Sequence, residues 1–258
     1  MNDVEVRITA LVVIYNRRCE DSPSCEGLRA DTKARAVIVD NSTEDNDNAR
    51  WCARRGFGYV AMGGNQGLSK AYNRGIAWIK ENTDATHVLL LDDDTTLPEG
   101  FLTQTAAQIE SKDRADVFCP LVQDERGLLS PCHIDGLRVT RVTDPAQLTA
   151  PTFTAINSGL AINLRVFDDY AYDEGYFLDY IDHAFFRDMK ACGVNFAVTD
   201  QTLSQRFSGN ERGNKRAAKR RLAIFKSDFR RFCGRSLKGR LFAQAVIIRR
   251  RVKIALSQ

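Results

Sequence analysis

The sequence contains no apolar run that approaches the roughly 18 residues a membrane-spanning helix needs. Its first residues, MNDVEVRITA, lack the basic segment followed by an apolar run that marks a secretory signal, so none is expected. None of the seven cysteines forms a C-x-x-C pair and their number is odd, which argues against a disulfide framework and a zinc site. We expect seven buried, reduced thiols in a cytoplasmic protein.

Charge is unevenly divided along the 258 residues, whose net charge is +4. Residues 206–258 hold 17 Lys and Arg against two acids, Glu211 and Asp228, so this segment carries +15 and residues 1–205 carry −11. Such a basic segment indicates contact with a polyanion, either nucleic acid or an anionic membrane. The composition, 43% hydrophobic and 27% charged, excludes a disordered or collagen-like chain.

Short apolar runs alternate with helical patterns through about residue 110. The runs predict strands at 8–15, 36–39, 59–62 and 87–91, and the patterns predict helices after the glycine-rich segment 63–67 and at 101–109. The segment 111–165 is less regular, and a last strand is predicted at 195–198. The alternation predicts an α/β fold with a mostly parallel central sheet flanked by helices.

Polar side chains follow three of the predicted strands. Tyr15, Asp40 and the triplet Asp92-Asp93-Asp94 lie at carboxyl ends of strands, where open parallel sheets bind ligands. Three adjacent carboxylates repel one another unless a cation lies between them, and Mg²⁺ binds one or two carboxylates together with substrate phosphates. The triplet therefore predicts a metal and diphosphate site, with a solvated acidic turn as the alternative.

A second acidic pair, Asp179 and Asp182, lies in an aromatic run at 176–186. Asp182 is expected near the start of a helix, where a carboxylate can serve as a cap. Together with the triplet, it can instead act as a general base that takes a proton from an attacking hydroxyl group. Tyr15 and Asp40 can contact a nucleobase or have structural roles, and the residues alone leave both open.

The basic segment contains two amphipathic helical patterns. In each pattern the apolar residues share one face: Leu222, Phe225, Phe229 and Phe232 in the first, and Leu241, Ala245, Ile248, Val252 and Leu256 in the second. We predict that 206–258 forms a basic helical extension. Its apolar faces can pack on the body, lie on an anionic membrane surface, or do both, whereas nucleic acid is the less favoured partner.

Six motifs follow one another in an order that resembles glycosyltransferase family 2, and most of all its bacterial rhamnosyltransferase-like branch. They are VVIYNR (12–17), VDNST (39–43), N-x-G-x-x-x-A-x-N (65–73), LLLDDDT (89–95), NSGL (157–160) and FLDYID (177–182). The resemblance covers about residues 8–205. It implies a GT-A nucleotide-sugar-binding fold, which is Rossmann-like, with the catalytic domain at 1–205.

The resemblance also implies an activity: inverting, metal-dependent transfer of a sugar from a nucleotide-diphosphate donor, dTDP-rhamnose or a UDP-sugar. The acceptor would be a hydroxyl of a growing, lipid-linked cell-surface glycan of the lipopolysaccharide, O-antigen or capsule type. The enzyme would then lie peripherally on the inner face of the cytoplasmic membrane. The implied residues are Asp182 as the base, Asp92, Asp94 and Gln205 as ligands of Mg²⁺ or Mn²⁺, and Tyr15, Asp40, Asn65, Asp92, Asp93, Ser158 and Gly159 at the donor.

The chain departs from the family pattern at three positions. Asp93 stands between the D-x-D acids where Gln or a similar residue is usual, and Ala184 replaces the acid usually found two residues after the base. Gln205 stands where some relatives have a His that binds the metal. Its carbonyl oxygen is the atom it can offer in place of that His.

Two other classes of protein share parts of these patterns. The segment 91–96 also fits the hhhDxDxT motif of haloacid dehalogenase-type phosphatases, with Asp92 as nucleophile and Asp94 as acid or base. That motif normally lies on the first strand, whereas 91 residues precede Asp92 here. A non-enzymatic protein that binds nucleic acid through the basic segment is the other alternative, but it gives the Asp triplet no role.

Overall fold

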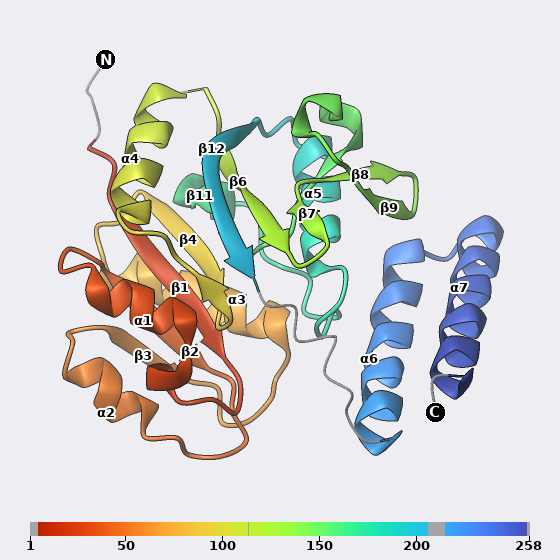
Figure 1. Cartoon of the computed structure of the whole chain (residues 1–258), viewed down its shortest axis with the longest axis horizontal. Helices are drawn as coiled ribbons and strands as arrows, with labels where there is room; N and C mark the ends of the chain where they lie inside the picture. Colours follow the sequence, from red (N-terminus) through yellow and green to blue (C-terminus); the bar gives the residue numbers. More distant parts are fainter. Residues whose placement is uncertain (1–4, 113, 206–214, 257–258) are drawn as a thin grey trace.

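The computed structural model describes residues 5–112, 114–205 and 215–256, and its centre is a nine-stranded sheet (Figure 1). The strand order is β3-β2-β1-β4-β11-β6-β12-β5, with β7 paired to β6. The strands are β1 (Ile8–Ile14), β2 (Ala36–Asp40), β3 (Gly58–Ala61), β4 (His87–Asp92), β5 (Thr95–Thr96), β6 (Val117–Asp124), β7 (Gly127–Ser130), β11 (Ala161–Asn163) and β12 (Phe196–Gln205). β1 to β4, β6 and β12 run in one direction, and β5, β7 and β11 run against them.

Parallel pairing aligns the strand ends that carry polar side chains. Ile14 of β1 pairs with Asp40, and Val13 pairs with Asp92. Tyr15, directly after β1, therefore lies at the same edge of the sheet as both acids. The strands themselves are apolar because helices cover both faces, which leaves almost no position in β1, β2 or β4 open to water.

Helices form a layer on each face of the sheet. One buried cluster joins α1 (Pro23–Ala30), α2 (Asn48–Ala53) and α4 (Phe101–Ser111) to one face. The other joins α3 (Leu68–Asn82), α5 (Ile181–Ala191), α6 (Lys215–Cys233) and α7 (Leu237–Leu256) to the opposite face. The predicted α/β fold, with a mostly parallel sheet between helical layers, is confirmed.

Part of the irregular segment 111–165 forms a second, small sheet. Its strand order is β10-β8-β9, with β8 (Cys132–Asp135), β9 (Arg138–Arg141) and β10 (Phe153–Thr154) all antiparallel. Single 3₁₀ turns complete the fold: η1 (Cys19–Asp21), η2 (Pro145–Gln147), η3 (Ala150–Thr152) and η4 (Leu164–Phe167).

The last strand is longer than the sequence predicts. The expected strand was 195–198, whereas β12 continues to Gln205, with an irregularity in its pairing with β6 between Val198 and Thr202. Beyond Val198 the strand alternates exposed polar and buried residues, so its sequence lacks an apolar run. The additional length matters for the site, because it brings Gln205 to the end of β4.

The two C-terminal helices differ in how they use their apolar residues. Phe225, Phe229 and Phe232 of α6 are at most 4% exposed, so the predicted face of this helix packs on the body. The predicted face of α7 does not pack, since Leu241 is 64% exposed and Ile248 is 49% exposed. The predicted boundary at 205/206, and the side chain of Leu256, lie outside the described residues.

Within the described ranges, no helix has the length and apolar character required to cross a bilayer. All seven cysteines are free thiols. Six are buried as expected, but Cys192, just after α5, is exposed, so the prediction of burial is wrong at that position.

Candidate active site

Two carboxylates and one amide meet at the end of β4. Asp92 ends this strand, Asp94 lies in the turn to β5, and Gln205 ends β12, which pairs with β5. Nε2 of Gln205 donates to Oδ2 of Asp92 at 2.8 Å and to Oδ1 of Asp94 at 3.0 Å. The structure thus brings together the three side chains predicted as metal ligands, with an N–H donor between the two acids.

Loss of solvent makes these carboxylates hard to ionise. Burial and, next, the charge of Asp94 raise the pKa of Asp92 to about 7, against the opposing effect of the Gln205 hydrogen bond. Burial also raises the pKa of Asp94, again against the Gln205 hydrogen bond. A cation between the two oxygens would stabilise their charged forms at neutral pH.

The donor set fits a hard divalent cation. Oε1 of Gln205 is buried and has no hydrogen-bond partner. Turning the amide end over exchanges Nε2 for Oε1 and directs three oxygen atoms to one point, which is the ligand type that Mg²⁺ and Mn²⁺ prefer. The described residues contain no metal-binding group of three His, Cys, Asp or Glu side chains. Gln205 is the amide that contacts both Asp92 and Asp94.

Asp93 points to a different partner. Nη1 of Arg17 lies 3.2 Å from its Oδ1 and 3.1 Å from its backbone oxygen, and Oγ of Ser22 donates to that backbone oxygen at 2.7 Å. Burial raises the pKa of Asp93 to about 6, and the charge of Arg17 opposes this rise. The pairing with Arg17 explains how a third acid is accommodated between Asp92 and Asp94.

Ser158 and Gly159 support the end of β4 from behind. Ser158 is 1% exposed, and its Oγ accepts from the backbone N–H of Asp92 at 3.1 Å. Gly159 has φ +89°, and a Cβ there would lie 2.5 Å from Leu203 Cδ1 and 2.6 Å from Pro120 Cγ. The segment is therefore buried against the carboxylate strand and fixes its backbone.

Asp40 and Tyr15 lie side by side at the strand ends but differ in exposure. Asp40 is 7% exposed, and its carboxylate accepts from Asn48 Nδ2 (2.9 Å), Tyr59 OH (3.2 Å) and the backbone N–H of Ser42 (3.0 Å). Tyr15 is 48% exposed, which leaves its ring open to a planar ligand. The protein thus holds the carboxylate of Asp40 in one orientation.

Asn65 lies in the loop that precedes α3. Its Oδ1 accepts from Asn41 Nδ2 and from the backbone N–H of Gly67, both at 3.2 Å. The backbone N–H of Leu68 in turn donates to the carbonyl of Phe177 at 2.7 Å. This loop therefore connects the strand ends near Asp40 with the segment that leads into α5.

Asp182 lies in the first turn of α5. Its Oδ1 accepts from the backbone N–H of His183 at 2.7 Å, and its side chain is 21% exposed. Its charge contributes to the raised pKa of Asp92, so the two acids lie within electrostatic reach of each other. The predicted base is thus within electrostatic reach of Asp92, one of the predicted metal ligands.

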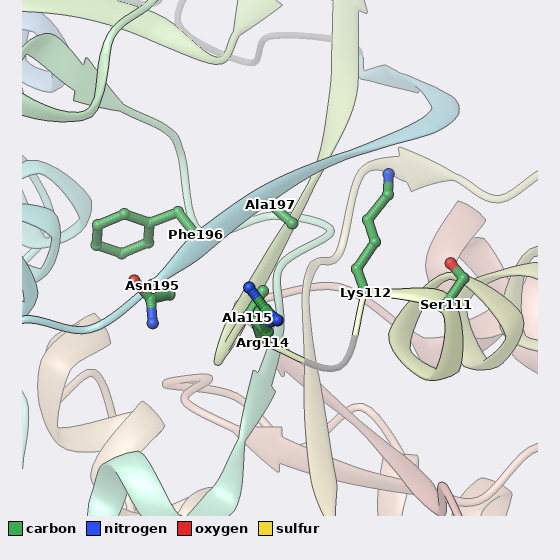
Figure 2. A pocket seen from close by; sticks show the side chains of 7 residues that line it. All are labelled: Ser111, Lys112, Arg114, Ala115, Asn195, Phe196 and Ala197. Carbon is green, nitrogen blue, oxygen red and sulfur yellow. The ribbon is translucent and has the colours of Figure 1, made fainter.

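A separate hollow of about 470 Å³ lies away from all of these residues (Figure 2). Its lining is Ser111, Lys112, Arg114, Ala115, Asn195, Phe196 and Ala197. It is at the amino ends of β6 and β12, which is the edge of the sheet opposite the Asp triplet. None of the predicted site residues lines it.

The sequence patterns did not reveal the residues that support the site. Arg17, Asn48 and Tyr59 hold Asp93 and Asp40 in place, and nothing in their spacing indicates those contacts. Asp228, by contrast, had a visible signal, because an acid is rare in the basic segment 206–258. Its side chain is fully buried in α6.

The family model described as "Glycosyl transferase family 2" matches residues 10–170. The dTDP-rhamnosyl transferase RfbF of Shigella flexneri is 24% identical over 180 residues, which is 68% of this chain and 60% of the relative. The chain thus spans about three fifths of that relative's length.

Two solved structures share the fold at low identity. The mannosyltransferase PcManGT of Pyrobaculum calidifontis, in complex with GDP-Man and Mn²⁺, has a TM-score of 0.61 at 15% identity, covering 95% of this chain and 70% of its own. S. aureus TarS 1–349, in complex with UDP, has a TM-score of 0.58 at 15% identity, covering 88% of this chain and 64% of its own.

The fold is therefore that of the GT-A glycosyltransferases. The chain belongs to glycosyltransferase family 2, as its motifs implied. This membership favours sugar transfer over the phosphatase and nucleic-acid alternatives.

Proposed function

We propose that this protein transfers a sugar from a nucleotide-diphosphate donor to a hydroxyl group, with inversion at the anomeric carbon and with Mg²⁺ or Mn²⁺ bound by Asp92, Asp94 and Gln205. The observation that carries the proposal is the meeting of two carboxylates and a buried, unpartnered amide oxygen within electrostatic reach of Asp182. The fold relative solved with GDP-Man and Mn²⁺ supports the same donor chemistry.

In this mechanism Asp182 is the catalytic base. Its carboxylate accepts the proton of the acceptor hydroxyl as the hydroxyl oxygen bonds to the anomeric carbon. The bond from that carbon to the diphosphate oxygen breaks on the opposite side, so a single displacement inverts the configuration. The bound cation would stabilise the negative charge of the departing nucleoside diphosphate.

The donor is held along the carboxyl ends of β1, β2 and β4. Tyr15 stacks on the base with its exposed ring, and Asp40 and Asn65 lie at the base and ribose end. Asp93, Ser158 and Gly159 fix the strand end that faces the diphosphate and sugar. The name of the Shigella relative supports dTDP-rhamnose as donor, with a UDP-sugar as the alternative.

Calorimetric titration with dTDP and UDP, with and without Mn²⁺, tests the donor site, and we expect binding that depends on the metal. In Asp182→Asn we expect unchanged nucleotide affinity and a loss of transfer of about 10²-fold or more, the usual contribution of a general base. Asp188→Asn is the matched control, because Asp188 lies on the same helix and pairs with Arg187 at 3.0 Å. Full activity of Asp182→Asn would show that another group is the base.

Replacement of Gln205 tests the third ligand. Gln205→Leu removes the amide oxygen, so we expect the Mn²⁺ concentration for half-maximal nucleotide binding to rise about tenfold or more. The exposed neighbour variant Ser204→Ala is the control on the same strand. An unchanged Mn²⁺ requirement in Gln205→Leu would exclude Gln205 as a ligand.

The surface of α7 supports a location at the inner face of the cytoplasmic membrane and a lipid-linked glycan acceptor. Its exposed apolar residues, here called the α7 stripe, are Leu237, Leu241, Ala245, Ile248 and Val252. At about 100° per residue they fall within about 80° of one another. Ala243 and Ile247, which pack on the protein, lie on the opposite side.

Basic side chains flank the α7 stripe on both sides. By the same helical geometry, Arg240 and Arg251 lie along one margin, and Lys238 and Arg249 along the other, all exposed. An apolar stripe between basic margins is the arrangement of helices that lie in the surface of anionic bilayers. We therefore propose that the α7 stripe lies on anionic lipid and holds the site near its acceptor.

A further inference from the structure

Asp228 is an acid enclosed by a basic helix. It is 0% exposed in α6, and the only other acid in 206–258 is Glu211. A buried carboxylate is retained only where strong donors surround it. Its donors are not on α6 but on the segment that leads into α5.

Three successive backbone N–H groups donate to this carboxylate. Oδ1 of Asp228 accepts from Phe177 at 3.0 Å, and Oδ2 accepts from Leu178 and Asp179, both at 2.8 Å. Consecutive amides that converge on one anion fix the path of the chain between them. Asp228 therefore sets the backbone of residues 177–179.

Arg221, about two turns earlier on α6, holds the side chain of the same segment. Both of its terminal nitrogens contact the two carboxylate oxygens of Asp179. This geometry is bidentate, which fixes orientation as well as distance. Burial alone would lower the pKa of the Arg221 guanidinium, but the hydrogen bonds and charge of Asp179, and more weakly the charge of Asp228, raise it above its ordinary value. The two α6 residues thus act on the loop as one linked group.

Tyr180, the next residue, enters α5 in a left-handed conformation with φ +63°. Its ring packs on α6, with ring centroids 4.9 Å from Phe229 and 4.8 Å from Phe232. A non-glycine residue keeps this backbone only where its surroundings enforce it. Asp182 follows two residues later, so the direction of the proposed base depends on this junction.

The same loop also supports the donor side of the site. The carbonyl of Phe177 accepts from the first residue of α3, and a Cβ on Gly67 would lie 3.0 Å from the Phe177 ring. A displacement at 177–179 is therefore transmitted both to Asp182 and to the loop that contains Asn65.

We infer that Asp228 and Arg221 are positioning residues, which hold the loop 177–180 so that the Asp182 carboxylate meets the acceptor hydroxyl. This inference rests on the proposed function, in which Asp182 is the base. The basic extension would then have two roles. Its helix α7 carries the α7 stripe, and its helix α6 supports the loop that orients Asp182.

The test uses the full chain with Asp228→Asn and Arg221→Gln, and with Arg230→Gln as control. Arg230 is exposed on the same helix and contacts only Gln244, at 3.5 Å, among the hydrogen bonds of the described residues. The first measurement is amide hydrogen exchange of the peptide 176–182, which needs no substrate. We expect at least tenfold faster exchange at 177–179 in both variants, unchanged exchange in β1 and β4, and no change in Arg230→Gln.

The second measurement is dTDP release from dTDP-rhamnose with Mn²⁺. We expect kcat to fall at least tenfold in both variants. We expect a smaller rise in the KM for dTDP-rhamnose, because Phe177 also contacts the loop that contains Asn65. Arg221→Lys should recover part of kcat. Unchanged loop exchange, or faster exchange throughout β1 and β4, would each overturn the inference. If Asp182→Asn is fully active while the loop still loosens in Asp228→Asn, the base assignment fails and the support of the loop stands.

Discussion

At the scale of single residues, Asp92 shows the conflict between burial and charge most clearly. Burial raises its pKa to about 7 from an ordinary value of 3.8. Between these two values the folded protein holds a proton that the unfolded chain has released. Rising pH therefore lowers the free energy of unfolding of the metal-free protein across this window.

We predict that Asp92→Asn stabilises the metal-free protein at pH 8, with a melting temperature at least about 3 °C higher, and changes it little at pH 4. Thermal unfolding in EDTA from pH 4 to pH 8 measures this. Asp124→Asn is a control for which we expect a lower melting temperature at pH 8. The bidentate contact with Arg141 lowers the pKa of Asp124 to about 2, so loss of this carboxylate should destabilise the folded protein at pH 8. A lower melting temperature of Asp92→Asn at pH 8 would contradict the argument.

At the scale of elements, the sequence predicted well wherever the local pattern decides the structure. The apolar run of β4 and its acidic end were identified because burial on both faces leaves an uninterrupted run. The predicted last strand ends at Val198, whereas β12 continues to Gln205. Its later residues alternate between buried and exposed positions without an apolar run, and they are held in the strand by pairing with β5 and β6. The contacts of Asp228 with residues 177–179 join parts of the chain about 50 residues apart, which no local pattern encodes.

The turn into β11 offers a prediction at this scale. Gly159→Ala introduces a Cβ at 2.5 Å from Leu203 and 2.6 Å from Pro120 at a backbone with φ +89°. We expect a loss of about 2 kcal/mol or more in the free energy of unfolding, measured by urea denaturation. Gly136→Ala is the control, because Gly136 also has a positive φ (+56°) but no heavy atom within 4 Å of the added carbon. Equal effects of the two variants would show that the close contacts with Leu203 and Pro120 do not cause the loss of stability.

At the scale of the whole molecule, the basic extension has two different surfaces. α6 turns its aromatic face to the body, whereas the side chains of the α7 stripe are exposed. Figure 1 shows α6 between the body and α7. The sequence predicted an apolar face on each of the two C-terminal helices. It could not show which face packs on the body, because that depends on how α7 lies against α6.

We predict that Leu241→Ser combined with Ile248→Ser lowers binding to vesicles of phosphatidylcholine and phosphatidylglycerol at least about tenfold, since each side chain contributes more than about 1 kcal/mol when buried in lipid. Co-sedimentation measures this, and the exposed α6 variant Ala223→Ser is the control. Unchanged sedimentation would exclude the α7 stripe as the contact. Loss of a dimer in the double variant would instead identify a second copy of the chain as its partner.

The way in which α6 reaches the loop before Asp182 has a practical consequence for anyone who shortens the gene. Deleting residues 206–258 removes α6 together with α7. This deletion would also remove the carboxylate of Asp228, which accepts hydrogen bonds from the backbone N–H groups of residues 177–179. Loss of activity in a truncated protein would therefore not show that membrane binding is needed for activity. Only substitutions confined to the exposed side of α7 can test membrane binding and catalysis separately.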